Sequence, residues 1–255
     1  MKFIKSKDND TIKQIHSLSV KKYREQLGLF ILEGEKVCKE AISSSVERIE
    51  QVIIKEGAED KYLPLVNNLN TICVSVEVFN FLSSTISPQD IMLVVKSCFY
   101  KLSNCSSNNI LVLDHLQDPG NLGTIIRSAI ASGFYDIVLI DSADPYSDKT
   151  IRSASGTIMH AKLYKTTTEN FVDFCTRKNY NIVIAEANKQ SVFDKSFKIN
   201  RPFALVIGNE GNGVSDEIKN KKQTSVSIPM DKRVESLNAG VSASILMFLL
   251  NCKEK

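Results

Sequence analysis

Residues 113–134 read LDHLQDPGNLGTIIRSAIASGF and join the end of an apolar run to a turn and a helix. Proline fixes φ and glycine accepts the left-handed conformation, so Asp118-Pro119-Gly120 predicts a turn. The following apolar side chains recur at the i, i+3, i+4, i+7 and i+8 positions of one helical face. They are Leu122, Ile125, Ile126, Ala129 and Ile130. The stretch therefore predicts a strand, a turn and a helix over residues 121–132.

Similar apolar runs of strand length recur along the second part of the chain. Parallel strands have this composition when helices cover both faces of their sheet. The runs are residues 110–113, 137–140, 182–185, 203–207 and 226–228. We therefore predict an α/β fold with a mostly parallel sheet over residues 110–255.

A smaller α/β layer is predicted in residues 1–97. Its strands are expected at residues 29–32, 51–54 and 91–95, with a short helix at residues 35–42. The segment SCFYKLSNCSSNN, residues 97–109, is rich in Ser and Asn and lacks apolar periodicity, so residues 98–109 are predicted to be a linker.

Composition excludes several classes of protein. No segment approaches the ~18 consecutive apolar residues of a membrane span, and the first ten residues lack the apolar run of a secretory signal, so we expect a cytoplasmic protein. The six cysteines form no CxxC pair and the three histidines are far apart, so no metal site is expected.

The charge of the first 26 residues is uneven. These residues include seven basic and three acidic side chains, whereas the net charge of the whole chain is only +3. This excess indicates either a surface for phosphate groups or a solvated helix face, and charge alone does not decide between them.

A second motif, residues 203–218, reads FALVIGNEGNGVSDEI. A buried strand is predicted to run into Gly208, Glu210, Gly211 and Gly213, and three glycines in six residues allow a backbone to approach a ligand closely. The spacing matches neither the P-loop nor the dinucleotide GxGxxG. A ligand-binding loop and an ordinary loop both remain open.

A third motif, residues 226–250, reads VSIPMDKRVESLNAGVSASILMFLL. We predict that a strand ends at Pro229 and that a helix begins near Ser236, which would be its N-cap. Small residues at 239–244 would let another backbone or a flat ligand pack against this helix. In the first motif, Asn121 is either a helix N-cap or a site residue, and Arg127 lies off the apolar face and is free to bind an anion.

Together and in this order, the strings DPGNLGTIIRSA, IGNEGNG and IPM…ESLN resemble the signature motifs of the SpoU/TrmH class of RNA methyltransferases. The resemblance covers about residues 107–252. FILEGEKVCKEA, residues 30–41, resembles the ribosomal-L30e-like substrate-binding domain that precedes the catalytic domain in many members. The resemblance implies a C-terminal SPOUT-type trefoil knot and a homodimer with active sites at the interface.

The resemblance also implies S-adenosylmethionine as cofactor and assigns the site residues. Contacts to the methyl donor would come from Gly208, Ile228 and Leu237, with Ile207, Met230 and Asn238 completing its pocket. The catalytic set would be Asn121, Arg127, Glu210, Ser236 and Asn238.

The implied reaction is methyl transfer to a ribose 2′-hydroxyl of RNA. Arg127 would stabilise the developing charge on that oxygen, since an arginine effectively never deprotonates. Members with an L30e-like domain more often resemble modifiers of ribosomal than of transfer RNA, so 23S rRNA is the expected substrate. The alternatives are a transfer RNA 2′-O-methyltransferase and an RNA-binding module without catalysis. A nucleotide-binding oxidoreductase is disfavoured because GxGxxG is missing.

Overall fold

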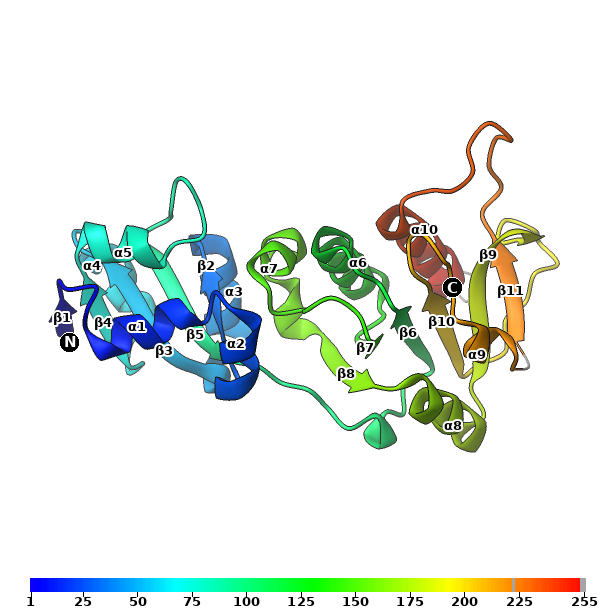
Figure 1. Cartoon of the computed structure of the whole chain (residues 1–255), viewed down its shortest axis with the longest axis horizontal. Coiled ribbons are helices and arrows are strands. Elements are labelled where there is room, and N and C mark those ends of the chain that lie inside the picture. Colours follow the sequence, from blue (N-terminus) through cyan, green and yellow to red (C-terminus); the bar gives the residue numbers. More distant parts are fainter. Residues whose placement is uncertain (222, 253–255) are drawn as a thin grey trace. The chain divides into compact units, whose positions relative to one another are not determined.

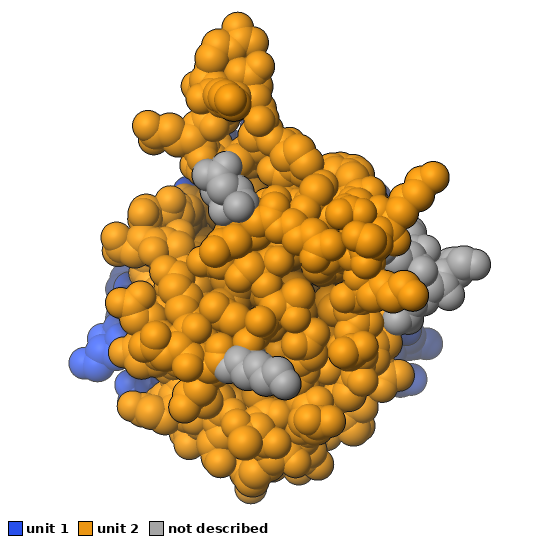
Figure 2. Space-filling model, turned by 90° about the vertical axis from the view of Figure 1, so that its right-hand side faces the viewer, with its two compact units in different colours: residues 1–98, 144–159 blue, residues 99–143, 160–255 orange. Residues whose placement is uncertain are grey.

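The computed structural model describes residues 1–221 and 223–252. The chain forms two compact units, one of residues 1–98 with 144–159 and one of residues 99–143 with 160–255 (Figures 1 and 2). Residues 144–159, which the sequence analysis assigned to the C-terminal domain, thus pack with the N-terminal residues. The last three residues of the predicted catalytic domain lie outside the described part.

The first unit is a five-stranded mixed sheet with helices around it, in the order β1-β4-β3-β5-β2. Strands β1, β3 and β4 run parallel, and β5 runs antiparallel to β2 and β3. The described strands are β1 (Lys2–Ile4), β2 (Leu29–Glu33), β3 (Ile49–Lys55), β4 (Thr71–Val74) and β5 (Ile91–Lys96). The described helices are α1 (Asp10–Ser17), α2 (Lys21–Leu27), α3 (Glu35–Ser44), α4 (Glu59–Tyr62), α5 (Val76–Leu82) and α7 (Asp148–Ala154).

The second unit holds a fully parallel sheet of six described strands, in the order β11-β9-β10-β6-β7-β8. The strands are β6 (Asn109–Asp114), β7 (Asp136–Ile140), β8 (Lys162–Thr166), β9 (Asn181–Ser191), β10 (Phe203–Ile207) and β11 (Gln223–Ser227). Helices in the described part are α6 (Pro119–Ser132), α8 (Thr168–Lys178), α9 (Asp216–Lys219) and α10 (Ala239–Cys252). The predicted α/β fold with a mostly parallel sheet is confirmed.

The strand order brings the three motifs to one edge of the second sheet. Strand β10 pairs with β6 in a register that sets Ile207 opposite Leu113. Since all six strands are parallel, the loops after β6, β10 and β11 leave the sheet at its carboxyl edge. In open α/β sheets this edge is where ligands bind.

Helix α6 begins two residues earlier than predicted. Asp118 is its N-cap, and the Asp118 carboxylate accepts a hydrogen bond of 2.7 Å from the Asn121 backbone N–H. The interpretation of Asn121 as an N-cap is therefore wrong, and its side chain is available for other contacts. The helix ends at Gly133, whose φ of 83° is a conformation that glycine adopts without strain.

Helix α10 begins later than predicted, at Ala239. The side chain of Asn238, not Ser236, accepts hydrogen bonds from the backbone N–H groups of Gly240 and Val241, at 2.9 and 3.3 Å. Strand β11 ends at Ser227, before Pro229. The loop between β11 and α10 projects from the second unit (Figures 1 and 2), and residues 231–236 are all exposed.

Small residues let α10 lie directly beside α6. A Cβ on Gly240 would stand 3.4 Å from the methyl group of Thr124, and Ser244 Oγ lies 2.7 Å from Ser128 Oγ. The prediction that small residues allow close packing here is confirmed. In the described part of the chain, no helix is long and apolar enough to span a membrane.

Candidate functional site

A pocket of about 720 Å³ opens at the carboxyl edge of the second sheet. The loops after β10 and β11 and the start of α10 form most of its walls. All six residues expected to contact the methyl donor line it: Ile207, Gly208, Ile228, Met230, Leu237 and Asn238. The structure thus collects in one cavity side chains that are up to 31 positions apart in the sequence.

Three of the five predicted catalytic residues also line this pocket, namely Glu210, Ser236 and Asn238. Asn121 stands beside it and joins two of them. Asn121 donates from Nδ2 to Glu210 Oε1 at 3.0 Å, and its Oδ1 accepts from Asn238 Nδ2 at 2.9 Å. One side chain from each motif therefore enters a continuous hydrogen-bonded row.

The carboxylate of Glu210 is held by several donors. Burial acts to raise its pKa, but the hydrogen bonds from Asn121 and from the backbone N–H groups of Gln117 and Asp118 outweigh burial, so the pKa is lowered. Glu210 is therefore an anion at neutral pH and attaches the loop after β10 to the start of α6.

Gly208 is required by the packing of the chain against itself. A Cβ at this position would lie 2.2 Å from the backbone carbon of Gly213 and 2.3 Å from the backbone nitrogen of Val214. The loop closes through two backbone hydrogen bonds between Asn209 and Gly213, of 2.9 and 3.0 Å. The glycines therefore allow a tight loop in which the backbone at Gly208 approaches the backbone at Gly213 and Val214.

A second set of polar groups, at the end of β6, fixes this loop and was not predicted from the sequence. Asp114, fully buried at the end of β6, accepts a hydrogen bond from the Ser215 backbone N–H at 2.7 Å and lies 2.7 Å from His115 Nδ1. Asn209 Nδ2 donates to the backbone oxygen of His115 at 2.8 Å. The available signal was an acidic residue ending an otherwise apolar buried strand.

Arg127 is placed apart from the other predicted residues. It is exposed on α6, three residues after Thr124, and does not line the pocket. Within residues 1–221 and 223–252, its guanidinium makes no hydrogen bond or ion pair. All its donors are therefore available to a group outside this chain.

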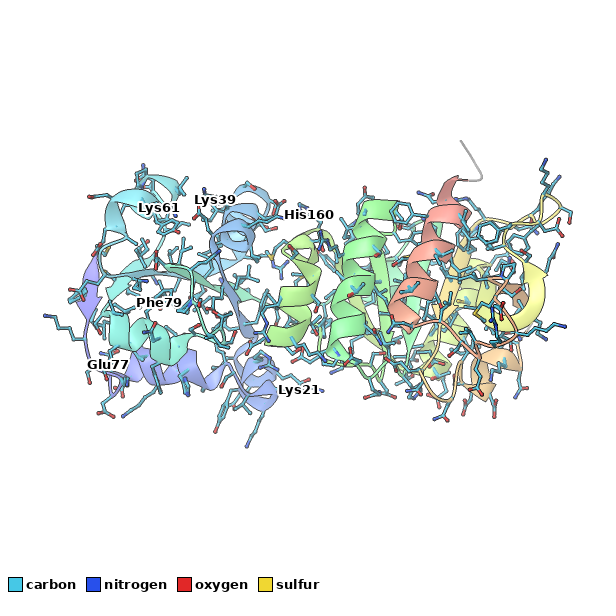
Figure 3. The ribbon with its side chains drawn as sticks, turned by 90° about the horizontal axis from the view of Figure 1, so that it is seen from above. Lys21, Lys39, Lys61, Glu77, Phe79 and His160 are labelled. Carbon is cyan, nitrogen blue, oxygen red and sulfur yellow. The ribbon has the colours of Figure 1, made fainter. Side chains whose placement is uncertain are left out.

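The basic excess near the N-terminus is smaller than the sequence indicated. Arg24 is only 7% exposed, and its guanidinium binds the Asp144 carboxylate at 2.7 Å and the backbone oxygens of Leu18 and Ser19. Lys7 pairs with Glu77 at 2.8 Å. Lys21 is exposed and points outward from α2 (Figure 3).

Comparison with known families agrees with this arrangement. The model of the SpoU rRNA Methylase family matches residues 108–248, and so spans all three motifs. The chain belongs to this family. A second model, the MRM3-like substrate binding domain, matches residues 9–93.

Relatives of this SpoU family member align along nearly its whole length. It is 32% identical over 253 residues to the 23S rRNA (guanosine(2553)-2′-O)-methyltransferase RlmP of Bacillus subtilis, covering 98% of this chain and 99% of the relative. It is 28% identical to an uncharacterised tRNA/rRNA methyltransferase of Synechocystis, covering 96% and 92% of the two chains.

Solved structures share the fold of this SpoU family member. An AdoMet-bound rRNA methyltransferase from Sinorhizobium meliloti superposes with a TM-score of 0.87 at 24% identity, covering 99% of this chain and 98% of the other. A putative RNA methyltransferase of the TrmH family from Porphyromonas gingivalis gives 0.85 at 25% identity, covering 96% and 98%.

Proposed function

We propose that this chain is an S-adenosylmethionine-dependent 2′-O-ribose methyltransferase acting on 23S rRNA in the cytoplasm. The observation that carries the proposal is the hydrogen-bonded row of Asn238, Asn121 and Glu210 at the edge of the 720 Å³ pocket. The named substrate of the Bacillus subtilis relative, aligned over 98% of this chain, supports 23S rRNA.

The residues of the pocket fit the methyl donor. Ile228, Met230 and Leu237 offer an apolar surface to a flat ring, and the carboxylates of Glu186 and Glu210 line the same space and suit a cation. S-adenosylmethionine, when bound, supplies a methyl group on a positively charged sulfur. The chain's own residues bind it at the strand ends and exclude water from its apolar side.

Transfer to a 2′-hydroxyl requires that the oxygen be aligned and its developing negative charge stabilised. We assign this role to Arg127, whose planar guanidinium can hold that oxygen and an adjacent phosphate with paired hydrogen bonds. Glu210 is anionic and can orient Arg127 or take the hydroxyl proton through water. Asn121, Ser236 and Asn238 position ribose and donor.

Arg127 reaches such a site most simply from a second copy of the chain. It lies outside its own pocket and has no partner within the described residues. On the neighbouring α10, Val241 and Phe248 are seven positions apart, and therefore on one face, and are 47% and 44% exposed. We infer a homodimer that buries this face and combines Arg127 of one copy with the pocket of the other.

The remaining assignments of the family resemblance stay part of the proposal. Residues 1–97 would form an L30e-like RNA-binding domain, supported by the match of residues 9–93 to a substrate-binding model. Residues 98–109 would be the linker, and residues 110–255, apart from residues 144–159 that pack with the first unit, the catalytic domain with a trefoil knot.

The test is methyl transfer by the full-length protein to purified 23S rRNA, with transfer RNA as a second substrate and the modified nucleotides mapped. We expect a 2′-O-methyl group on 23S rRNA alone. Binding of S-adenosylhomocysteine without transfer to either RNA would contradict catalysis, and transfer to transfer RNA alone would contradict the substrate.

Arg127 is tested in the same assay. Arg127→Ala should lose about 10²-fold or more in rate while its affinity for S-adenosylhomocysteine is unchanged. Arg127→Lys keeps the charge but loses the paired geometry, so it should stay slow at every pH; near-normal turnover at high pH would instead indicate a general base.

Mixing Arg127→Ala with Glu210→Gln tests the homodimer. A mixed dimer holds one site with both native residues, so activity should return. No recovery in mixed dimers would place Arg127 at the pocket of its own chain.

A further inference from the structure

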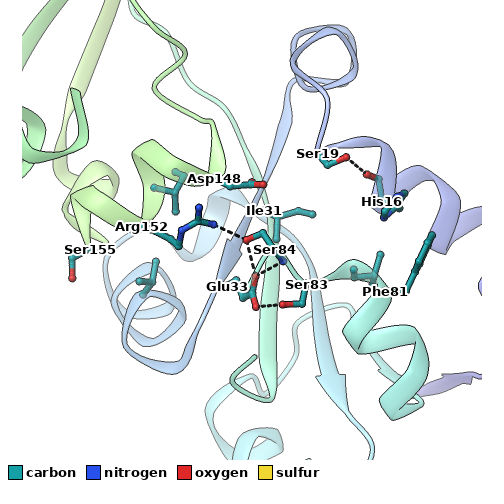
Figure 4. A pocket seen from close by; sticks show the side chains of 13 residues that line it. His16, Ser19, Ile31, Glu33, Phe81, Ser83, Ser84, Asp148, Arg152 and Ser155 are labelled. Carbon is teal, nitrogen blue, oxygen red and sulfur yellow. Dashed lines mark hydrogen bonds between the residues drawn. The ribbon is translucent and has the colours of Figure 1, made fainter. Parts of the chain in front are cut away.

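The first unit contains a second pocket, of about 300 Å³, outside the site described above. It lies between α1, β2, α5 and α7 (Figure 4). Its apolar lining is Ile31, Val37, Leu82 and Ile151. Asp148 and Arg152 of α7 stand on one side, and His16 and Phe81 stand on the other.

Two flat rings form one wall of this pocket. His16 stacks on Phe81 with their centroids 4.0 Å apart and their planes 18° from parallel. Aromatic and histidine rings of this kind stack with unpaired bases in sequence-specific RNA recognition. The volume and the apolar lining suit a flat heterocycle.

The two carboxylates of the pocket differ in what they already bind. Glu33 accepts hydrogen bonds from Ser83, Ser84 and Thr85, including the Ser84 backbone N–H at 3.0 Å, so its oxygens are used in fixing residues 83–85. Asp148 has no hydrogen bond or ion pair among the residues that the structure describes. Burial raises the pKa of Asp148, although the positive charges of Arg24 and Arg152 act to lower it.

The guanidinium of Arg152 also has N–H groups that are not hydrogen-bonded within the described residues. One of its five N–H groups, on Nη1, donates to Ser84 Oγ at 2.9 Å. It lies one helical turn after Asp148 on α7 but turns to Ser84 and makes no ion pair with Asp148. The pocket therefore offers an acceptor and several donors about one turn apart.

We propose that this pocket binds an unpaired guanine of the RNA substrate. A carboxylate only accepts hydrogen bonds, and guanine alone among the four bases presents two adjacent donors, N1–H and N2–H, on one edge. Its O6 and N7 acceptors suit a guanidinium, the commonest specific contact to guanine. Asp148 accepts hydrogen bonds from N1–H and N2–H, and Arg152 donates hydrogen bonds to O6 and N7. The His16–Phe81 stack contacts the ring.

This inference rests on RNA being the substrate, but its test does not depend on methyl transfer. The full-length protein is titrated, at one salt concentration, against labelled uridine octamers whose central residue is guanosine, adenosine or inosine. Inosine lacks the N2 amino group. We expect guanosine to bind about tenfold or more tightly than either alternative. Equal affinity for the three oligomers would overturn the proposal.

Asp148→Asn should abolish the preference for guanosine over inosine and leave the affinity for the adenosine oligomer unchanged. Asp60→Asn makes the same chemical change on α4 of this unit, outside the pocket, and should behave as the native protein. An equal loss of affinity for all three oligomers in Asp148→Asn would also overturn the proposal.

Competition with guanosine monophosphate separates RNA from a free nucleotide. Competition as strong as by the guanosine oligomer would overturn the assignment to RNA. Thermal unfolding checks that Asp148→Asn is folded, and the inosine comparison in the native protein needs no variant. A guanine preference without methyl transfer would contradict only the proposed reaction, and transfer without the preference only this pocket.

Discussion

Adding one methyl group at Gly208 should disrupt the proposed donor pocket without removing any side chain that lines it. The Cβ of Gly208→Ala would stand 2.2 Å from the Gly213 carbon, 2.4 Å from its oxygen and 2.3 Å from the Val214 nitrogen. Carbon atoms in contact are normally about 3.5–4.0 Å apart, so the backbone must retreat by more than about 1 Å. No flexible side chain is available to move in its place.

The cost has two parts. Overpacking of this kind costs about 1–3 kcal/mol. The retreat also breaks the two Asn209–Gly213 backbone hydrogen bonds, of 2.9 and 3.0 Å, each of which contributes about 1 kcal/mol net. We therefore expect Gly208→Ala to destabilise the second unit by about 3–5 kcal/mol, or roughly 10 °C in its unfolding temperature.

Gly211→Ala is the matched control. Its Cβ would meet only Asn209 Oδ1, at an ordinary 3.5 Å. Stability should change by less than about 1 kcal/mol. Calorimetry would measure the unfolding temperature of both variants. It would also measure the affinity for S-adenosylhomocysteine, which should fall at least about tenfold in Gly208→Ala. Equal unfolding temperatures and equal affinities in the two variants would refute the packing argument.

Three other predictions concern charged groups. The folded-state pKa of Glu210 lies below its ordinary value of 4.5, so its carboxylate stabilises the fold above that pH and the contribution is lost as pH falls through the folded value. Unfolding temperatures of Glu210→Gln and the native protein should therefore converge in acid; a constant difference would contradict the role of its charge. Changing the exposed Lys21 and Lys22 to Glu should reduce the magnitude of the slope of log RNA affinity against log salt by about two. Arg24 is buried against Asp144, so Arg24→Ala should instead lower the free energy of unfolding by about 3–5 kcal/mol. An unchanged slope in the lysine variant would move the phosphate contacts elsewhere.

The central strands of the second sheet could be predicted because they are buried on both faces. Strand β10 is buried at every position, and an unbroken run of apolar residues of this length is typical of a parallel strand that is covered on both faces. Strand β8, at the sheet edge, was missed because its residues Lys162 and Lys165 are exposed and break the apolar run. Strand β1, three residues long at the edge of the first sheet, was missed for the same reason.

The sequence predicted most of the residues that gather around the candidate pocket, but not the contacts between them. The hydrogen bonds of Asn121 with Glu210 and Asn238 join positions 89 and 117 residues apart, a separation that no local pattern encodes. The helical periodicity of α6 correctly placed Arg127 away from the apolar face. No such pattern predicts that Arg24 on α2 is buried against Asp144, which is 120 residues away.

The buried anchor at Asp114 links the two halves of the proposed reaction. Asp114 ends β6, and its carboxylate holds the Ser215 N–H, just after the glycine-rich loop, while Asn209 in that loop holds the backbone of His115. Glu210, one residue on, holds Asn121 on α6. The loop that lines the proposed donor pocket and the helix that carries Asn121 and Arg127 therefore follow the carboxyl ends of two neighbouring strands, β10 and β6. A displacement of this loop must move the row of Asn121, Glu210 and Asn238 with the pocket, so a disturbance at Gly208 should impair donor binding and the alignment of the ribose together.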